Sequence, residues 1–128
     1  MIDHVSLAVS DLAVSRAFYR GVLETIGLNE LVLRETTVGF GKKYAELWIN
    51  ARPGMDRVDE DAGAHVCLRA SSESAVTAFH EAAIALGGTD AGAPGGRRGA
   101  LGPYFGAFIY DPDGNKIEAL TFPRSEAE

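Results

Sequence analysis

The sequence contains a single cysteine, Cys67, so no disulfide can form within the chain. It also lacks the run of roughly 20 apolar residues that a membrane helix needs. Its first residues do not have the basic and then apolar layout of a signal peptide. Basic residues are outnumbered, because 12 Lys and Arg stand against 18 Asp and Glu, and the formal net charge of −6 argues against a broad phosphate-binding surface. We therefore expect a cytoplasmic protein that binds neither nucleic acid nor a membrane.

Apolar residues are plentiful enough for one hydrophobic core. The chain has 128 residues, of which 46% are hydrophobic. This length supports one domain over residues 1–128, or two small half-domains that share a sheet, but not two independent cores.

The clearest local element is a hairpin near the end of the chain. Residues 104–110 and 116–122 read as strands, and the segment DPDGN between them supplies typical turn residues. Glu118 lies in the middle of the second strand, between apolar neighbours. Burying an unpaired carboxylate costs several kcal/mol, so we expect either a wet face or a cation or metal beside it.

The remaining patterns predict a strand, a helix and three strands, twice over. In the first half we expect strands at residues 2–9, 28–34, 36–40 and 44–50. We expect a helix from an N-cap at Asp11 to about Leu23, followed by Gly27 as its stop. The apolar stripe of this helix consists of Leu12, Val14, Phe18 and Val22. In the second half we expect a strand at 65–69, a helix at 73–86 capped by Ser71 or Ser72, a glycine-rich loop at 92–102 and then the hairpin. The modules cover about 1–50 and 64–122, and the acidic, Pro-Gly-containing segment 51–63 links them.

The two halves repeat each other in sequence. A shift of 61 positions superimposes His4 on His65, together with four further identical pairs on the strand and the helix. A shift of 72 superimposes Glu46 on Glu118 near the ends of the halves. Two copies are too few for a solenoid, so a paired, pseudo-symmetric sheet is the better interpretation.

These segments resemble the vicinal oxygen chelate superfamily, which includes glyoxalase I, bleomycin and fosfomycin resistance proteins and extradiol dioxygenases. The resemblance is carried by IDHVSLAVSDLAVSRAFYRGVL, GAHVCLRA and YDPDGNKIEAL, which span most of the chain. It implies an α+β fold in which two βαβββ modules form a half-open, cup-shaped mixed sheet with the helices on its outer face. It also implies a metal on the inner face that grips two neighbouring substrate oxygens.

By position, the resemblance implies the metal ligands His4, Glu46, His65 and Glu118. Strand alternation independently places these four side chains opposite their apolar neighbours, on the inner face. Two imidazoles and two carboxylates suit Zn, Ni, Co, Mn or Fe(II) and leave positions open for substrate. The plainer alternative is that each His is a hydrogen-bonded core residue. If Glu46 is not a ligand, the two His and Glu118 form the triad of Fe(II) dioxygenases.

The chemistry implied is that of a glyoxalase-like enzyme, a lyase or isomerase that works through a metal-chelated enediolate or related vicinal-oxygen intermediate. Glu118 or Glu46 is the candidate general base for a proton next to a carbonyl. The alternative function is a metal-free binding or antibiotic-resistance protein that sequesters an apolar or cationic compound. We expect a small-molecule substrate and a homodimer, whose modules pair within one chain or are swapped between chains.

Several further inward-facing residues are candidates for contact with a substrate. Trp48, Tyr104, Phe108 and Tyr110 line the cup or are ordinary core residues. Arg69 binds an anionic substrate or solvates the rim. Cys67 shares this face, where we expect a buried, inert thiol. Arg97 and Arg98 lie in the expected glycine-rich loop, as an anion-binding lid or simply as solvated side chains.

Overall fold

The computed structural model describes residues 1–123 as two modules of one helix and four strands each. The first module contains β1 (Val5–Val9), α1 (Leu12–Glu24), β2 (Asn29–Leu33), β3 (Thr37–Gly41) and β4 (Ala45–Ala51). The second contains β5 (Val66–Arg69), α2 (Glu73–Ala85), β6 (Thr89–Gly99), β7 (Gly102–Tyr110) and β8 (Lys116–Thr121). The α+β class and the repeated βαβββ order expected from the sequence are confirmed.

Each module forms its own four-stranded mixed sheet with the same strand order. The orders are β1-β4-β3-β2 and β5-β8-β7-β6. In both, the first strand runs parallel to the last, with Val5 opposite Leu47 and Val66 opposite Ile117, and the other neighbours are antiparallel. This equivalence explains the sequence repeat, because matched residues occupy matched places in the two sheets.

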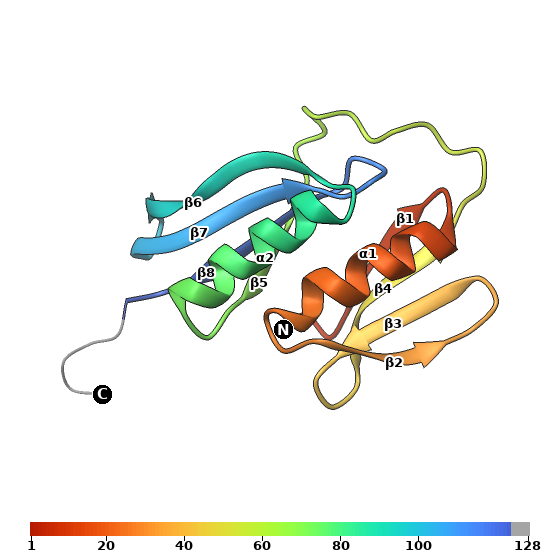
Figure 1. Ribbon diagram of the computed structural model, residues 1–128, viewed down its shortest axis with the longest axis horizontal. Helices are drawn as coiled ribbons and strands as arrows, with labels where there is room; N and C mark the ends of the chain where they lie inside the picture. Colours follow the sequence, from red (N-terminus) through yellow and green to blue (C-terminus); the bar gives the residue numbers. More distant parts are fainter. Residues whose placement is uncertain (124–128) are drawn as a thin grey trace.

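The two helices lie side by side and cover one face of both sheets (Figure 1). Side-chain oxygens of Asp11 and Ser72 accept hydrogen bonds from the backbone N–H groups of Val14 and Ala75, so both expected N-caps form. Helix α1 ends at Glu24. The φ angle of Gly27 is 83°, in the left-handed region that glycine adopts without steric cost. We call the other side of each sheet, away from the helices, its open face.

The hydrophobic core fills the space between the helices and the sheets. Fully buried side chains come from α1, from α2 and from the helix-facing positions of the strands, including Phe18, Phe79, Leu47 and Ile117. Burying each such side chain stabilises the fold by about 1.5 to 3 kcal/mol. Val14, expected in the apolar stripe of the first helix, is exposed instead, because the buried side of α1 is centred on Phe18 and its neighbours.

The glycine-rich segment 92–102 is not the loop that its composition predicts. Most of it belongs to β6, which pairs with β7 as far as Gly99 opposite Gly102, with two register irregularities between Asp90 and Gly95. The guanidinium of Arg97 reinforces this pairing by donating hydrogen bonds to the carbonyl oxygens of Gly95 and Gly106. Backbone pairing and these bonds outweigh the low strand propensity of glycine.

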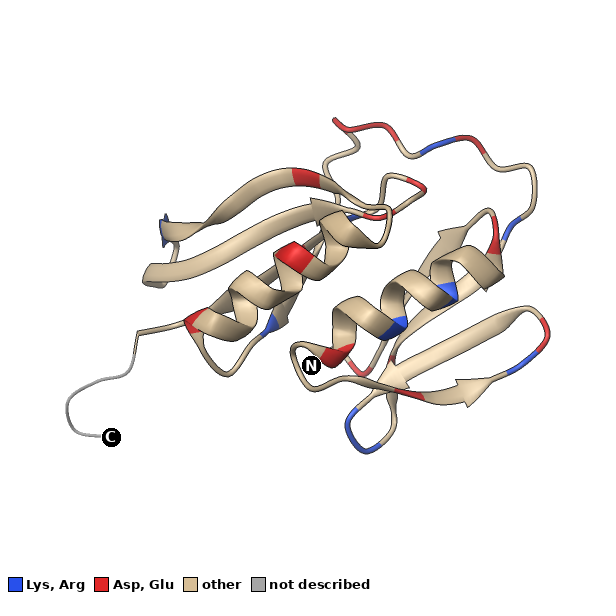
Figure 2. Ribbon diagram, in the orientation of Figure 1, with Lys and Arg blue, Asp and Glu red and all other residues tan. Residues whose placement is uncertain are grey.

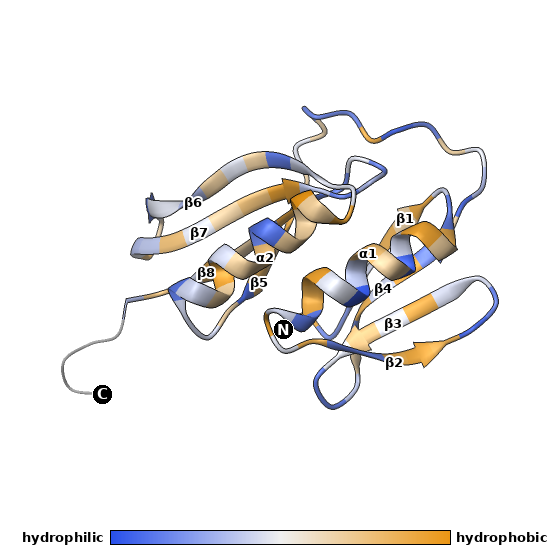
Figure 3. Cartoon of the chain, viewed as in Figure 1, coloured by the Kyte–Doolittle hydropathy of each residue, from blue (hydrophilic) through white to orange (hydrophobic). Residues whose placement is uncertain are grey.

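The segment between β4 and β5, residues 52–65, contains no helix or strand. Figure 2 shows charged residues of both signs along it, and Figure 3 shows that it is largely hydrophilic. Its irregular backbone and its hydrophilic, charged composition agree with the linker between the modules that we expected at residues 51–63. Neither helix in residues 1–123 is long and apolar enough to cross a membrane.

The turn between β7 and β8 connects the two modules through buried and half-buried hydrogen bonds. The hydroxyl of Tyr19, on α1, donates to Oδ2 of Asp111 at 2.6 Å. Asn115 donates its side-chain amide to the same Oδ2 and to the carbonyl oxygen of Ala8, at 2.8 and 2.9 Å. Burial and the nearby Asp111 charge hold the pKa of Tyr19 well above its usual range. The phenol is therefore a neutral donor to the carboxylate.

Candidate active site on the open face of the second sheet

Glu118 occupies the centre of the open face of the second sheet. Its neighbours along β8, Ile117 and Ala119, are fully buried against the helix side, so the carboxylate points to the other face. Across the sheet it lies opposite Cys67 on β5 and Phe108 on β7. The residue is nevertheless only 4% exposed. A carboxylate this deeply buried needs compensating partners.

One carboxylate oxygen of Glu118 has such a partner. Oε1 lies 3.0 Å from Nε2 of His65, the residue immediately before β5. Since a carboxylate can only accept, Nε2 carries the proton and donates it to this bond. The other oxygen, Oε2, is buried and has no hydrogen-bond partner among the described residues. A buried oxygen left in this state is unusual, because such atoms are ordinarily satisfied by a protein group, an ordered water, an ion or a ligand.

Gly106 on β7 leaves room for this carboxylate. A Cβ atom added there would lie 3.3 Å from Oε2 of Glu118 and 2.8 Å from a ring carbon of Tyr104. The second distance is too short for a real Cβ atom, so any side chain would displace the Tyr104 ring. The glycine therefore keeps Glu118 and Tyr104 close together.

A small apolar cavity lies beside Glu118. Its volume is about 240 Å³, and its walls come from β7, β8 and the turn between β6 and β7. The lining residues are Gly99, Ala100, Leu101, Gly102, Tyr104, Glu118, Leu120 and Phe122. Glu118 is the one ionisable carboxylic acid among them, so the cavity combines apolar walls with a single acidic group. This combination is typical of small-molecule sites.

Basic side chains lie over the faces of the aromatic rings near the Glu118 carboxylate. The ring of His65 lies 5.7 Å from that of Phe108, and Nζ of Lys116 lies 5.0 Å from the same ring. The Arg97 guanidinium lies 5.3 Å from the Phe108 ring. Arg69 stands 5.3 Å from the ring of Phe122, which lines the cavity. The three distances from Lys116, Arg97 and Arg69 are within the range of cation–π attraction.

The charge and burial around Glu118 change the acidity of two neighbours. Desolvation, with the Glu118 charge second, raises the pKa of Cys67 to about 12. Desolvation, together with Glu118, also raises the pKa of Tyr104. Cys67 is exposed, contrary to the expectation of a buried thiol, yet it stays protonated at neutral pH and is a poor nucleophile.

The equivalent residues of the first module lie on a more open surface. His4 and Glu46 are exposed, and Nδ1 of His4 lies 2.7 Å from Oδ1 of Asp3. The paired part of β1 begins at Val5 rather than at residue 2, so His4 stands just ahead of the sheet. A cavity of about 360 Å³ between β1 and β5 is nevertheless lined by His4, Glu46 and His65.

The structure therefore gathers the four predicted metal ligands only in part. His65 and Glu118 are in contact, and His65 shares a cavity with His4 and Glu46. Within residues 1–123, no three His, Cys, Asp or Glu side chains are close enough to hold one metal ion. The orphaned Oε2 of Glu118 is nonetheless the kind of donor that a divalent cation satisfies. The pair His65 and Glu118 thus fits one half of a metal site.

The predicted substrate-binding residues all lie on open faces. Register places Tyr104, Phe108 and Tyr110 on the same face as Glu118, and Arg69 two residues beyond Cys67 on that face. Trp48 lies on the open face of the first sheet, where it covers Gly39. Sequence reasoning did not single out Lys116 or Gly106, although both share the parity of Glu118 or its cross-strand neighbours.

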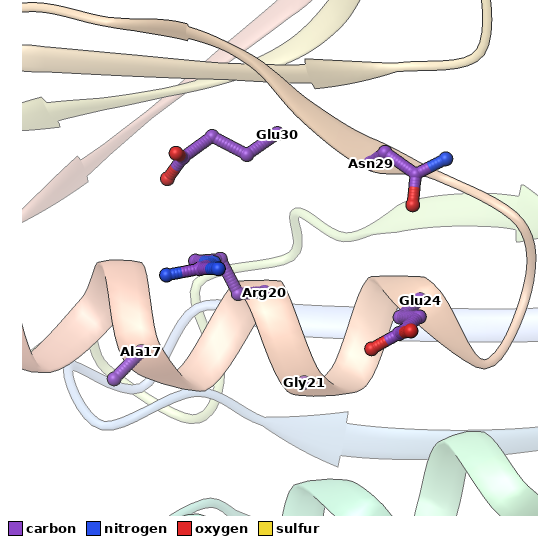
Figure 4. Close-up of a pocket in the computed structure, with 6 residues that line it drawn as sticks. All are labelled: Ala17, Arg20, Gly21, Glu24, Asn29 and Glu30. Atoms are coloured by element: carbon purple, nitrogen blue, oxygen red, sulfur yellow. The ribbon is translucent and has the colours of Figure 1, made fainter.

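A larger groove lies on the helix side of the first sheet, between α1 and β2. Its volume is about 530 Å³, and Figure 4 shows Arg20 and Glu24 of the helix across from Asn29 and Glu30 of the strand. Arg16 forms an ion pair with Glu30, with Nε 2.6 Å from Oε1. This groove is polar and contains no orphaned buried group among its lining residues. It is therefore a weaker candidate for a functional site than the cavity beside Glu118.

Comparison with known proteins places the chain in a family. The sequence profile of the Glyoxalase/Bleomycin resistance protein/Dioxygenase superfamily matches residues 1–119. The chain belongs to this superfamily. No curated protein is significantly similar in sequence to this superfamily member.

Solved structures support the same assignment. A glyoxalase/bleomycin resistance protein from Albidiferax ferrireducens T118 is 35% identical, with 92% of this chain and 96% of that chain aligned and a TM-score of 0.81. The V278E mutant of glyoxalase I from Zea mays is 25% identical over 91% of this chain and 44% of that chain, with a TM-score of 0.70. A glyoxalase-related enzyme from Fulvimarina pelagi is 17% identical, covers 94% of this chain and 86% of that chain, and has a TM-score of 0.67, which shows the shared fold.

Proposed function

We propose that this superfamily member is a metal-dependent enzyme that acts on a small organic substrate, with Glu118 as its general base. The observation that carries the proposal is the state of the Glu118 carboxylate. It is buried beside an apolar cavity, one oxygen is held by His65, and the other is unpartnered. A base needs an oriented carboxylate with a free oxygen directed at the substrate.

His65 and the cavity walls prepare the Glu118 carboxylate for proton transfer. His65 donates from Nε2 to Oε1 and fixes the orientation of the carboxylate, and Oε2 would take a proton from a carbon next to a carbonyl group when it is not bound to the metal. The apolar walls of the cavity exclude water from this oxygen. Isomerisation, epimerisation and elimination all begin with such a step, so the reaction class is that of a lyase or isomerase.

His4, Glu46, His65 and Glu118 are the residues that would hold the metal. When bound, a divalent ion such as Zn, Ni, Co, Mn or Fe(II) supplies a Lewis acid that polarises substrate oxygens. His65 and Glu118 are already together, and the bond from Nδ1 of His4 to Asp3 leaves Nε2 of His4 available as a ligand. Glu46 is exposed at the same cavity and is the alternative general base.

Metal titration with matched variants tests this proposal. We expect the purified protein to bind Zn²⁺, Ni²⁺ or Mn²⁺ in calorimetry, and His65→Ala and Glu118→Gln each to weaken binding by at least about tenfold. His80→Ala is the control, because His80 is the third histidine of the chain and pairs with Asp90 beside α2. Equal affinity in all four proteins, or no affinity in the wild type, would contradict a metal site at these residues.

A metal-free binding protein is the second candidate function. It is favoured by the spacing of the predicted ligands, because residues 1–123 hold no three-ligand group. The aromatic and apolar cavity beside Glu118 alone can hold a small ligand. Ligand binding that is unchanged by EDTA, in a protein that takes up no transition metal, would establish this candidate instead.

A further inference from the structure

Charge is divided unevenly between the two faces of the second module. Residues 65–121 contain four Lys or Arg and six Asp or Glu. The basic residues Arg69, Arg97 and Lys116 lie opposite Leu120, Tyr104 and Tyr110, which places all three on the open face with Glu118. The fourth basic residue is Arg98.

The acidic residues of this module lie elsewhere. Figure 2 shows them along α2, at the start of β6 and in the turn before β8. Asp90 lies opposite Ile109, a core residue, and bonds to His80 of α2. Glu118 is thus the one acidic residue of the module on the open face. Three cations and one carboxylate give this face a positive charge, although the whole chain carries −6.

The positive charge of the open face is not neutralised by acidic partners. Within residues 1–123, none of the three basic side chains forms an ion pair. Arg97 donates to backbone carbonyl oxygens, and the other two lie against aromatic rings. Like charges kept together without counter-ions raise the local concentration of anions.

The cavity next to these cations limits the size of the ligand. Its volume of about 240 Å³ is below the usual range for ligand sites, and its walls include Tyr104, Leu120 and Phe122 together with the carboxylate of Glu118. The guanidinium of Arg69 lies over the ring of Phe122, which is one of the wall residues of the cavity. The volume suits one ring, and the position of Arg69 suits an anionic group attached to it.

We propose that the open face of the second module binds a monocyclic aromatic carboxylate, with its ring against Tyr104 and Phe122 and its carboxylate directed by Arg69. Lys116 and Arg97, which lie over the ring of Phe108 on the same face, strengthen the attraction. This names the substrate class of the site proposed above and rests on that proposal for its catalytic meaning. It disfavours the cationic ligand that the net charge of the chain suggests.

Calorimetric binding of phenylacetate and its neutral isostere phenylacetamide tests the proposal. In low-salt buffer with EDTA, we expect phenylacetate to bind the wild-type protein at least about fivefold more tightly than phenylacetamide. Arg69→Gln should remove most of this preference and leave the affinity for phenylacetamide unchanged. Lys116→Gln should reduce it by about twofold to threefold, because its charge is farther from the cavity.

Arg98→Gln is the matched control for these variants. Arg98 is adjacent to Arg97 but lies opposite Pro103, on the other face of the sheet. Its replacement should leave both affinities unchanged, and far-ultraviolet circular dichroism should show that each variant is folded. Equal affinity for the two compounds, no measurable binding of either, or an equal effect of Arg98→Gln would overturn the proposal. Because EDTA removes metal from this assay, its outcome is independent of the metal titration.

Discussion

The Glu118 charge acts on neighbouring side chains, in addition to the role that we propose for it toward a substrate. Cys67 lies directly opposite it on β5, and the pKa of the thiol rises to about 12 through desolvation and through this charge. Since only the thiolate reacts, the reactivity of Cys67 reports the charge on Glu118. Because Cys67 is the single cysteine of the chain, no other thiol contributes to the measured rate of thiol modification.

Alkylation of Cys67 by iodoacetamide at pH 8 should therefore be slow. We expect a rate at least roughly 50-fold below that of free cysteine, because the thiolate fraction is small and its higher nucleophilicity compensates only in part. Glu118→Gln should increase the rate severalfold, without reaching the free value, because desolvation remains. Mass spectrometry of the labelled protein measures both rates.

Two further samples complete that measurement. Protein unfolded in urea should react at the free rate, and Glu81→Gln, on α2, should react like the wild type. If Glu118→Gln leaves the rate unchanged, the Glu118 carboxylate is not the charge that acts on Cys67.

At the scale of elements, the turn between β7 and β8 is the main polar link between the modules. Asp111 accepts hydrogen bonds from Tyr19 on α1 and from Asn115, and it is 1% exposed. Burial raises the pKa of Asp111, and the bond from Tyr19 opposes that rise. Tyr19 thus stabilises the ionised carboxylate in addition to joining the helix to the turn.

Replacing Tyr19 by Phe should lower the free energy of unfolding by about 1 to 2 kcal/mol at pH 7, because a buried hydrogen bond to a carboxylate is lost. Chemical denaturation followed by circular dichroism measures the change. Tyr44→Phe is the control, since Tyr44 is exposed and its loss should cost little. Equal stability of the Tyr19→Phe and wild-type proteins would show that the link does not stabilise the fold.

The same pair of proteins should differ in its dependence on alkaline pH. The folded pKa of Tyr19 is raised, so its contribution is complete below the unfolded pKa of about 10 and is lost as the pH rises through the folded value. Above about pH 10, the wild type should lose stability faster than the Tyr19→Phe protein. A constant difference between the two from pH 7 to 11 would contradict this assignment.

Local patterns predicted most elements and one contact of the site. Alternation and the repeat placed His65 and Glu118 on one face, and parallel pairing of β5 with β8 brings them together. The glycine-rich composition of β6 gave the wrong prediction of a loop, because glycine gives no alternation signal. The strand forms through backbone hydrogen bonds to β7, which the local sequence does not reveal. Arg97 was therefore assigned to a loop, and the basic character of the open face was missed.

At the scale of the whole molecule, the decisive question is how the two modules meet. Within one chain, His4 and Glu46 of the first module and His65 of the second line one cavity. Strand patterns cannot predict this meeting, because it depends on the packing of α1 against α2 and on the buried bonds of the β7–β8 turn. If the proposed metal site exists, this arrangement favours building it within one chain, even if the protein is the homodimer that we expect.

Mixing two variants that each lack one proposed metal ligand separates a site within one chain from a site shared between swapped chains. His4→Ala removes the proposed ligand of the first module, and His65→Ala removes its proposed counterpart in the second. In a swapped dimer, a mixed pair regains one intact site, because an unaltered His4 from one chain meets an unaltered His65 from the other. In a site built within one chain, every site in the mixture lacks one histidine. We therefore expect no recovery of metal binding when the two proteins are unfolded together, refolded and titrated with Zn²⁺.

Two controls accompany this experiment. Co-refolded wild-type protein controls for losses in refolding, and a mixture of His4→Ala with the double variant His4→Ala/His65→Ala defines the baseline. Recovery to about one quarter of the wild-type metal content, the share expected from random pairing, would instead show that second copies complete the site.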